Sequence, residues 1–468
     1  MDYVETARRV AAPNKYRVSA FADISEKTVF VSLLALVVIT AVPYGTAEHW
    51  WKAFFICAVA ALSLLAVIES TATGSGRLGG RVLLIPLVVG TVFAFLQTVP
   101  FGARATPGIP HAPWNAISFD PYATRFFALQ LMALTLAAAL LFRYAATERR
   151  LRIVIHIVIG VAVASAIFGM MRQTTQHSDG FILPLIQTGQ GYGQFVNQNH
   201  FAYLMEMGFG LTLGMILGGG VRRERALIYF AALLPIWTAL VLSNSRGGLL
   251  AMLAQVIAAV LLFPVVVPAE PNSPGLKALR VVRMWPVRVF LLVLLLSAVV
   301  GGTLWIGGDR LVSRFESVGV ERDPAAVSRK EIWQATWEMW KAHPMAGVGM
   351  GGYWVAIPGY HNASGTLVPQ EAHNDYLELL ASGGIVGAAI GIWFCAVLFK
   401  RTRTSLRLPG RFRRAASFGA VLGIVGVGVH SLFDFGLHML VNALIFMILI
   451  VVATTDVKDE RSERKVIS

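Results

Sequence analysis

The chain has 468 residues, of which 56% are hydrophobic and 14% charged, and its mean hydropathy is +0.64. Soluble domains carry about 25% charged residues, so this composition excludes a large soluble protein and indicates a polytopic membrane protein. The net charge of +14 does not indicate a nucleic-acid partner, because the basic residues cluster in short loops between apolar runs, as membrane orientation signals do.

Twelve apolar runs approach the roughly 17–25 residues that a spanning helix needs. The residues before the first run are polar and mixed, so we expect this run to be retained and not cleaved as a signal peptide. The predicted spans are Thr28–Tyr44, Trp51–Ile68, Val82–Val99, Thr124–Tyr144, Arg152–Met171, Asn199–Leu217, Ala226–Leu242, Leu249–Val267, Val289–Ile306, Tyr376–Phe399, Ala415–Val429 and Leu440–Ala453. The sequence therefore predicts an all-α polytopic membrane protein with about 12 transmembrane helices.

The distribution of positive charge predicts the topology. With a cytoplasmic N-terminus, 29 of the 40 Lys and Arg residues fall in cytoplasmic segments, and six of the other 11 lie in the long loop Gly307–Asp375. Long loops cross the membrane largely regardless of charge. The predicted organisation is a cytoplasmic tail (1–27), nine spans (28–306), an extracytoplasmic loop that contains amphipathic helices (307–375), three spans (376–453) and a cytoplasmic tail (454–468).

Two polar positions among the spans are candidates for function. Glu206 is a carboxylate inside the sixth predicted span, and pairing with an arginine is its expected use. Arg246 lies in the break between the seventh and eighth spans, where it either anchors at the interface or binds an anion. In the second case Ser245 and nearby backbone amides could approach a phosphate together with the guanidinium, which bonds phosphate bidentately.

Arg329 begins a predicted amphipathic helix in the long loop. Helical spacing places Trp333, Trp337 and Trp340 near one stripe that also contains Arg329. Such a helix lies on the bilayer surface with its tryptophans among the headgroups. Arg329 would then face the depth at which lipid phosphates lie.

His373 closes the long loop next to Asn374, just before the tenth span. A lone histidine is more often structural, but an imidazole that titrates near neutrality can also act as a general base. His430, Asp434 and His438 have helical spacing that could hold a metal. A turn between the last two spans would separate them, so we favour a polar gate and expect neither metal nor cofactor.

Taken together, these motifs resemble the O-antigen ligase and polymerase superfamily. The resemblance covers roughly Asn197–Val452, and the first five spans match only in hydropathy. The motifs that carry it are Asn197–Ala202 at the start of the sixth span, Ser245-Arg246-Gly247, Arg329 with Trp333, Pro344 with Gly347-Val348-Gly349, His373–Leu377 and Gly383–Gly387.

The resemblance implies a GT-C-like, metal-independent, inverting glycosyltransferase in the bacterial inner membrane, with both termini cytoplasmic and a periplasmic active site. Its donor would be a glycan on undecaprenyl diphosphate, held by Arg246 and Arg329, and His373 would deprotonate the acceptor hydroxyl. The positions implied to contact substrate are Asn199, Glu206, Ser245, Trp333, Asn374 and Tyr376.

The sequence leaves the identity of the acceptor open. It is a second lipid-linked glycan in a polymerase and lipid A–core in a ligase, and related enzymes glycosylate proteins. The turn from His430 to His438 and Asn442 resemble exopolysaccharide-type members, which favours a polymerase. A transporter would distribute charges through several spans with helices broken at the midplane. Here the polar residues gather at one face, and a pure scaffold would leave the two arginines and His373 unexplained.

Overall fold

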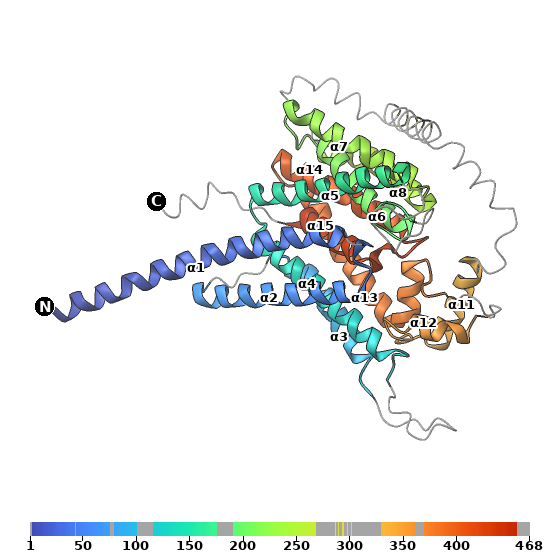
Figure 1. The fold of residues 1–468 in the computed structure, drawn as a ribbon, viewed down its shortest axis with the longest axis horizontal. Helices are drawn as coiled ribbons and strands as arrows, with labels where there is room; N and C mark the ends of the chain where they lie inside the picture. Colours follow the sequence, from blue (N-terminus) through green and yellow to red (C-terminus); the bar gives the residue numbers. More distant parts are fainter. Residues whose placement is uncertain are drawn as a thin grey trace.

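The computed structural model describes residues 2–42, 44–74, 79–100, 116–175, 191–267, 329–361 and 369–455, with five single positions between 286 and 301; only the backbone is described for residues 2–19. Regular structure in these ranges is helical (Figure 1). The helices are α1 (Asp2–Ala41), α2 (His49–Thr73), α3 (Arg81–Leu96), α4 (Pro121–Tyr144), α5 (Glu148–Thr175), α6 (Gln198–Leu217), α7 (Arg223–Leu242), α8 (Arg246–Val266), α11 (Arg329–Ala342), α12 (Tyr353–Ala356), α13 (Asp375–Ser405), α14 (Arg411–His430) and α15 (Leu440–Thr454), with 3-10 turns η1 (Tyr44–Thr46), η2 (Ile357–Gly359) and η3 (Gly436–His438).

Eleven of the twelve predicted spans coincide with a helix in the described ranges, and the ninth, Val289–Ile306, lies outside them except for single positions. Nine of these helices are long and apolar enough to cross a membrane, while α3 and α15 are shorter. The chain is therefore a multi-pass membrane protein. The first span begins near Ala20, earlier than predicted, because good helix formers precede the apolar run and α1 continues back to Asp2.

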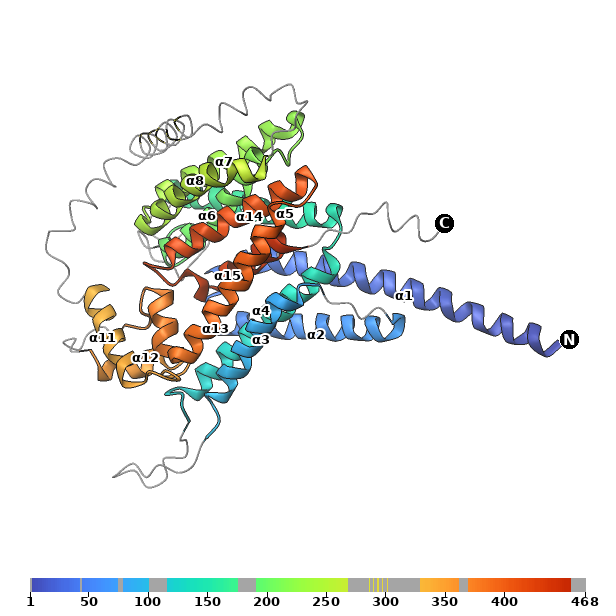
Figure 2. The same cartoon turned by 180° about the vertical axis from the view of Figure 1, so that it is seen from behind.

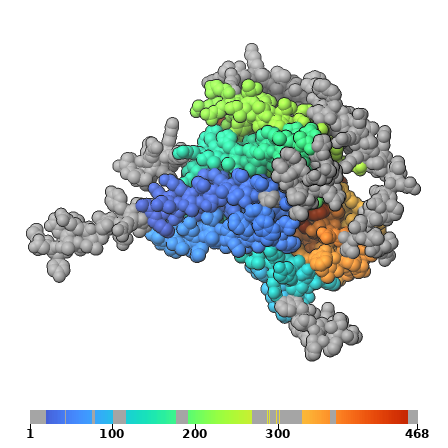
Figure 3. All heavy atoms as spheres, viewed as in Figure 1, coloured from blue at the N-terminus to red at the C-terminus, as the bar shows by residue number. Residues whose placement is uncertain are grey.

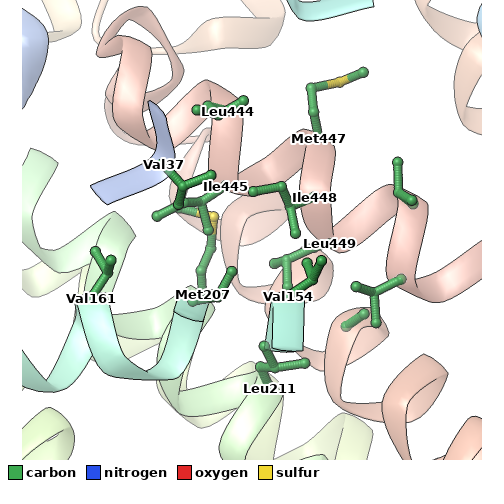
Figure 4. Close-up of a cluster of buried hydrophobic side chains, with 14 of the residues drawn as sticks. Val37, Val154, Val161, Met207, Leu211, Leu444, Ile445, Met447, Ile448 and Leu449 are labelled. Atoms are coloured by element: carbon green, nitrogen blue, oxygen red, sulfur yellow. The ribbon is translucent and has the colours of Figure 1, made fainter. Parts of the chain in front are cut away.

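Helix α15 is the centre of the bundle, which explains why it can be short. Nearly all its side chains are buried, and a helix that is apolar all round belongs inside a protein. Figure 4 shows side chains of α15, such as Ile445 and Leu449, meeting Val37 of α1, Val154 of α5 and Met207 of α6. The core is thus built from both halves of the sequence.

Helices α6 and α14 approach so closely that no side chain fits between them. A Cβ added to Gly210 would lie 2.5 Å from Gly423 N, and one added to Gly214 would lie 2.1 Å from Gly419 Cα. Both helices carry small residues at four-residue spacing, which is how membrane helices allow close backbone contact. This contact fixes the register of the two helices.

Helix α13 is broken at Gly384, whose φ of 61° and ψ of −162° suit only glycine. The turn 344–349 completes the hydrogen bonds that the break leaves open. In this backbone joint, the amides of Val348 and Gly349 donate to Ala381 O (3.1 Å) and Ser382 O (3.0 Å), and those of Ile385 and Val386 donate to Pro344 O (2.8 Å) and Met345 O (3.1 Å).

Gln97, at the C-terminus of α3, secures the joint with its buried side chain. Its amide nitrogen donates to Ala346 O at 2.8 Å and to Ser382 O at 3.0 Å, and its oxygen accepts from Met350 N at 3.1 Å. The Gly347-Val348-Gly349 and Gly383-Gly384 motifs therefore mark one structural device that attaches the loop after α11 to the bundle.

The polar residues gather where α6, α8, α13 and α15 begin and α14 ends, which we call the α11 end. In Figures 1 and 2, α11 and α12 lie at this end, on the opposite side of the bundle from the start of α1. Figure 3 shows α1 and α2 across one face, with the orange α11–α13 region at the right. Basic residues gather at the opposite end, where Arg414 bonds Val266 O and Arg152 lies over the Phe412 ring.

Candidate functional site

Polar groups from several elements converge on Asp434, in the turn between α14 and η3. Its side chain is only 1% exposed. One carboxylate oxygen accepts hydrogen bonds from the side-chain amide of Asn199 and from Arg329 Nη2, the latter at 3.4 Å. The other accepts from the backbone amide of Phe435 at 2.9 Å. Asp434 therefore joins α6, α11 and the α14–α15 turn at one point.

Two imidazoles also face Asp434. His373 Nδ1 lies 3.5 Å and His200 Nε2 lies 3.8 Å from its Oδ1 atom, and the Phe435 ring packs edge-on against both histidines. Burial alone would raise the pKa of Asp434. The opposing effects of His373, His200 and the Phe435 amide hold that pKa below its usual range, so Asp434 is an ionised carboxylate beside His373.

His373 lies in the turn before α13, and its side chain is 31% exposed. Asn374 forms the N-cap of α13 by accepting from the amides of Tyr376 and Leu377, at 3.1 and 3.0 Å. The Tyr376 hydroxyl donates to Gly428 O at 2.7 Å. In this structure Asn374 and Tyr376 therefore hold the turn and its helix in place, next to His373.

Arg329 is the first residue of α11, and its side chain is 47% exposed. The buried face of α11 consists of Ile332, Ala335, Thr336 and Met339, so the helix packs on protein and not only on a membrane surface. Trp333 is half-buried and its indole N–H donates to Ala372 O at 3.0 Å. Trp333 thus ties α11 to the residue before His373, while Trp337 on the same helix is 45% exposed.

Arg246 is an exposed residue at the start of α8. Ser245 is its N-cap, and the buried Ser245 hydroxyl accepts from Gly248 N at 3.1 Å. The next residue, Gly247, lies against the His430 ring, since a Cβ added there would be 2.5 Å from His430 Nε2. This contact places the helix N-terminus that carries Arg246 beside the turn that carries Asp434.

Glu206 pairs with a histidine and not with an arginine, so the predicted arginine pairing is wrong. Its Oε2 atom lies 3.0 Å from His430 Nδ1, and the two side chains are 0% and 1% exposed. The Tyr203 ring stacks on His430 with centroids 4.1 Å apart. The close packing of α6 and α14 brings this pair together and leaves the Glu206 side chain fully buried.

His438 contacts three carboxylates. Its Nδ1 atom lies 3.2 Å from Glu371, and its Nε2 atom lies 3.5 Å from Glu378 and 3.7 Å from Asp375. Burial disfavours the imidazolium, but the attraction of Glu371 and Glu378 outweighs it and raises the pKa of His438 to about 10. Burial likewise opposes ionisation of Glu371, yet His438 lowers the pKa of Glu371 to about 2.

The spacing His430-x₃-Asp434-x₃-His438 does not form one site. The turn after α14 separates the three residues, as expected, and each contacts a different set of side chains. The described residues do contain one group of possible metal-binding character, Glu371, Glu378 and His438, whose ligand atoms lie within 4.8 Å of one another. The sequence analysis did not single out this group.

The groups around Asp434 are of the kinds that can catalyse the transfer of a group to a hydroxyl. An ionised carboxylate faces one nitrogen of the His373 imidazole, which leaves the other nitrogen for a proton acceptor role. A half-exposed guanidinium lies beside the same carboxylate, and a second arginine begins a nearby helix. Cationic groups at a partly desolvated site can stabilise an anionic leaving group.

A known protein family matches the middle of the chain. Residues 230–392 match a family model described as O-antigen ligase. This match supports the resemblance to the O-antigen ligase and polymerase superfamily over about a third of the chain. A search of curated proteins finds no match.

The matched segment contains Arg246, Arg329 and His373. It excludes Asn199 and Asp434, although both belong to the cluster described above. The structure brings Arg329 and His373 together on Asp434 and puts Arg246 at the same end of the bundle. The sequence analysis grouped Asp434 with His430 and His438, and only the fold shows that it contacts Arg329 and His373.

Proposed function

We propose that the protein is a glycosyltransferase that moves a glycan from an undecaprenyl-diphosphate donor to an acceptor hydroxyl on the periplasmic side of the inner membrane. The observation that carries the proposal is the contact of Asp434 with both Arg329 and His373. The O-antigen ligase family match supports the same reaction class.

His373 is the proposed general base. With Nδ1 facing Asp434, its Nε2 atom can take the proton from the acceptor hydroxyl as the oxygen attacks the anomeric carbon. The imidazolium that forms is stabilised by the carboxylate. The 3.5 Å separation is longer than a strong hydrogen bond, and such contacts often tighten only when substrate binds.

Arg246 and Arg329 are the proposed diphosphate ligands. As the bond between the anomeric carbon and the diphosphate oxygen breaks, the lipid diphosphate leaves with its electron pair, and two guanidinium groups can stabilise this charge. A diphosphate is a weak base, so it needs charge neutralisation more than a proton. A single displacement of this kind inverts the anomeric centre. The same proposal includes a GT-C-like fold, a reaction that needs no metal, and an acceptor of either the polymerase or the ligase type.

The test is reconstitution in proteoliposomes with undecaprenyl-diphosphate glycan and, in separate reactions, a second lipid-linked glycan, lipid A–core or a protein acceptor. The reaction that yields product identifies the acceptor class. We expect His373→Ala, Arg246→Ala and Arg329→Ala to abolish product formation, with partial recovery in the lysine variants of the arginines. Arg225→Ala, at the opposite end of the bundle, is the matched control. Undiminished product from the three alanine variants would contradict the proposal, and glycolipid translocation without product would favour a transporter.

A further inference from the structure

The backbone of His373 is in the left-handed region, with a φ of 51°. For a residue with a side chain this conformation is unfavourable, so neighbouring contacts must hold it. The residues on both sides are indeed fixed. Ala372 O accepts from Trp333 Nε1 at 3.0 Å, and Asp375 N donates to Ser431 O at 3.0 Å.

One imidazole joins the two ends of this turn. Glu371, two residues before His373, contacts His438 Nδ1 at 3.2 Å, and Asp375, two residues after His373, lies 3.7 Å from His438 Nε2. Glu378 adds a third connection: one of its oxygens lies 3.5 Å from His438 Nε2, and the other accepts from Ala372 N at 2.8 Å. His438 therefore connects to the turn both before and after His373.

Both ring nitrogens of His438 face carboxylate oxygens. An ionised carboxylate only accepts hydrogen bonds, and a neutral imidazole has one nitrogen that also only accepts. In a neutral His438, one ring nitrogen would therefore be a hydrogen-bond acceptor that faces a carboxylate oxygen, which is also an acceptor. The contacts with Glu371 at Nδ1 and with Asp375 at Nε2 are matched when the ring carries both protons, so the geometry favours an imidazolium between these two carboxylates.

We propose that His438 is a positioning residue: as an imidazolium it ties Glu371 to Asp375 and Glu378, and so keeps the intervening His373 turned toward Asp434. This inference rests on the proposed function, in which His373 is the base. His438 touches no reacting atom and acts only through the turn. The alternative explanation of the same cluster is a divalent cation held by Glu371, Glu378 and His438. The two explanations exclude each other, because a ring nitrogen that binds a cation must be unprotonated.

The experiment compares His438→Gln, His438→Lys, Glu371→Gln and the double variant His438→Gln/Glu371→Gln with the wild type in proteoliposomes. We expect His438→Gln to lower kcat about 10- to 100-fold, as a small misplacement of a catalytic group does, with the donor KM changed less than about threefold. His438→Lys, which keeps a cation, should recover part of kcat. The double variant should be little worse than either single one, because the two residues form one contact. His156→Gln, which changes a histidine on α5, is the matched control.

A second measurement does not depend on catalysis. Amide hydrogen exchange of the peptide Ala372–Tyr376 should become at least about tenfold faster in His438→Gln and stay unchanged in His156→Gln. If the wild type yields no product, the proposed function fails and the exchange result alone decides the inference. Wild-type kcat in His438→Gln refutes the positioning role. If a chelator abolishes both activity and exchange protection and added zinc restores both, a bound cation and not an imidazolium explains the cluster.

Discussion

Replacing Asp434 by asparagine is the sharpest test of the mechanism. The change keeps the shape of a side chain that is 1% exposed and removes its charge. In the proposed mechanism His373 gains a proton in the transition state, and the resulting charge pair would be 3.5 Å apart. Coulomb's law gives about 4.7 kcal/mol for this pair at a dielectric constant of about 20 and about 1.2 kcal/mol at about 80. Because His373 is 31% exposed, the effective value lies between these limits.

Each 1.36 kcal/mol corresponds to a factor of about ten in rate, so kcat of Asp434→Asn should fall about 10- to 3,000-fold. The assay is initial-rate product formation in proteoliposomes at saturating donor and acceptor. Asp120→Asn is the matched control, because Asp120 caps α4 and asparagine caps helices equally well. A kcat of Asp434→Asn within twofold of the wild type would refute the electrostatic role of Asp434, provided that the protein is folded.

Two further predictions concern stability. Gly384→Ala should lower the yield of folded protein and its melting temperature in detergent, because the φ of Gly384 is 61° and an added Cβ would lie 2.4 Å from Met345 C. The control is Gly160→Ala, which should have little effect because an added Cβ there meets nothing within 4 Å. Equal melting temperatures for the two variants would contradict the strain argument. The pKa of His438 is raised from 6.5 to about 10, so its stabilising contribution is complete below about pH 6.5 and is lost as the pH rises through about 10. The wild type should therefore lose more melting temperature than His438→Gln between pH 7 and 10.5, and parallel losses would show that His438 does not titrate in this way.

The sequence predicted the helices well because each apolar run must lie in lipid or in the core. Eleven runs match helices within a few residues at most ends. The start of α1 was less predictable, since polar residues with high helix propensity extend a span without changing its hydropathy. The joint at Gly384 could not be predicted either, because its hydrogen bonds join backbone groups 33 or 41 residues apart along the chain.

The site was only partly predictable. Arg329 and His373 were found through their motifs, and the structure puts both on Asp434. Asp434 itself was grouped with His430 and His438 by helical spacing, a grouping that the turn breaks. The partner of Glu206 was predicted wrongly, because charge alone favours an arginine. Only the glycine contact between α6 and α14 shows that His430 lies opposite.

The joint at Gly384 has a consequence for exchanging parts of the enzyme. Its four bonds run from main chain to main chain, so they depend on backbone path and on glycine, not on which side chains the turn carries. Gln97 likewise bonds only to backbone groups there. A segment from α11 to the joint could therefore be replaced by one with different side chains and still attach to the same bundle.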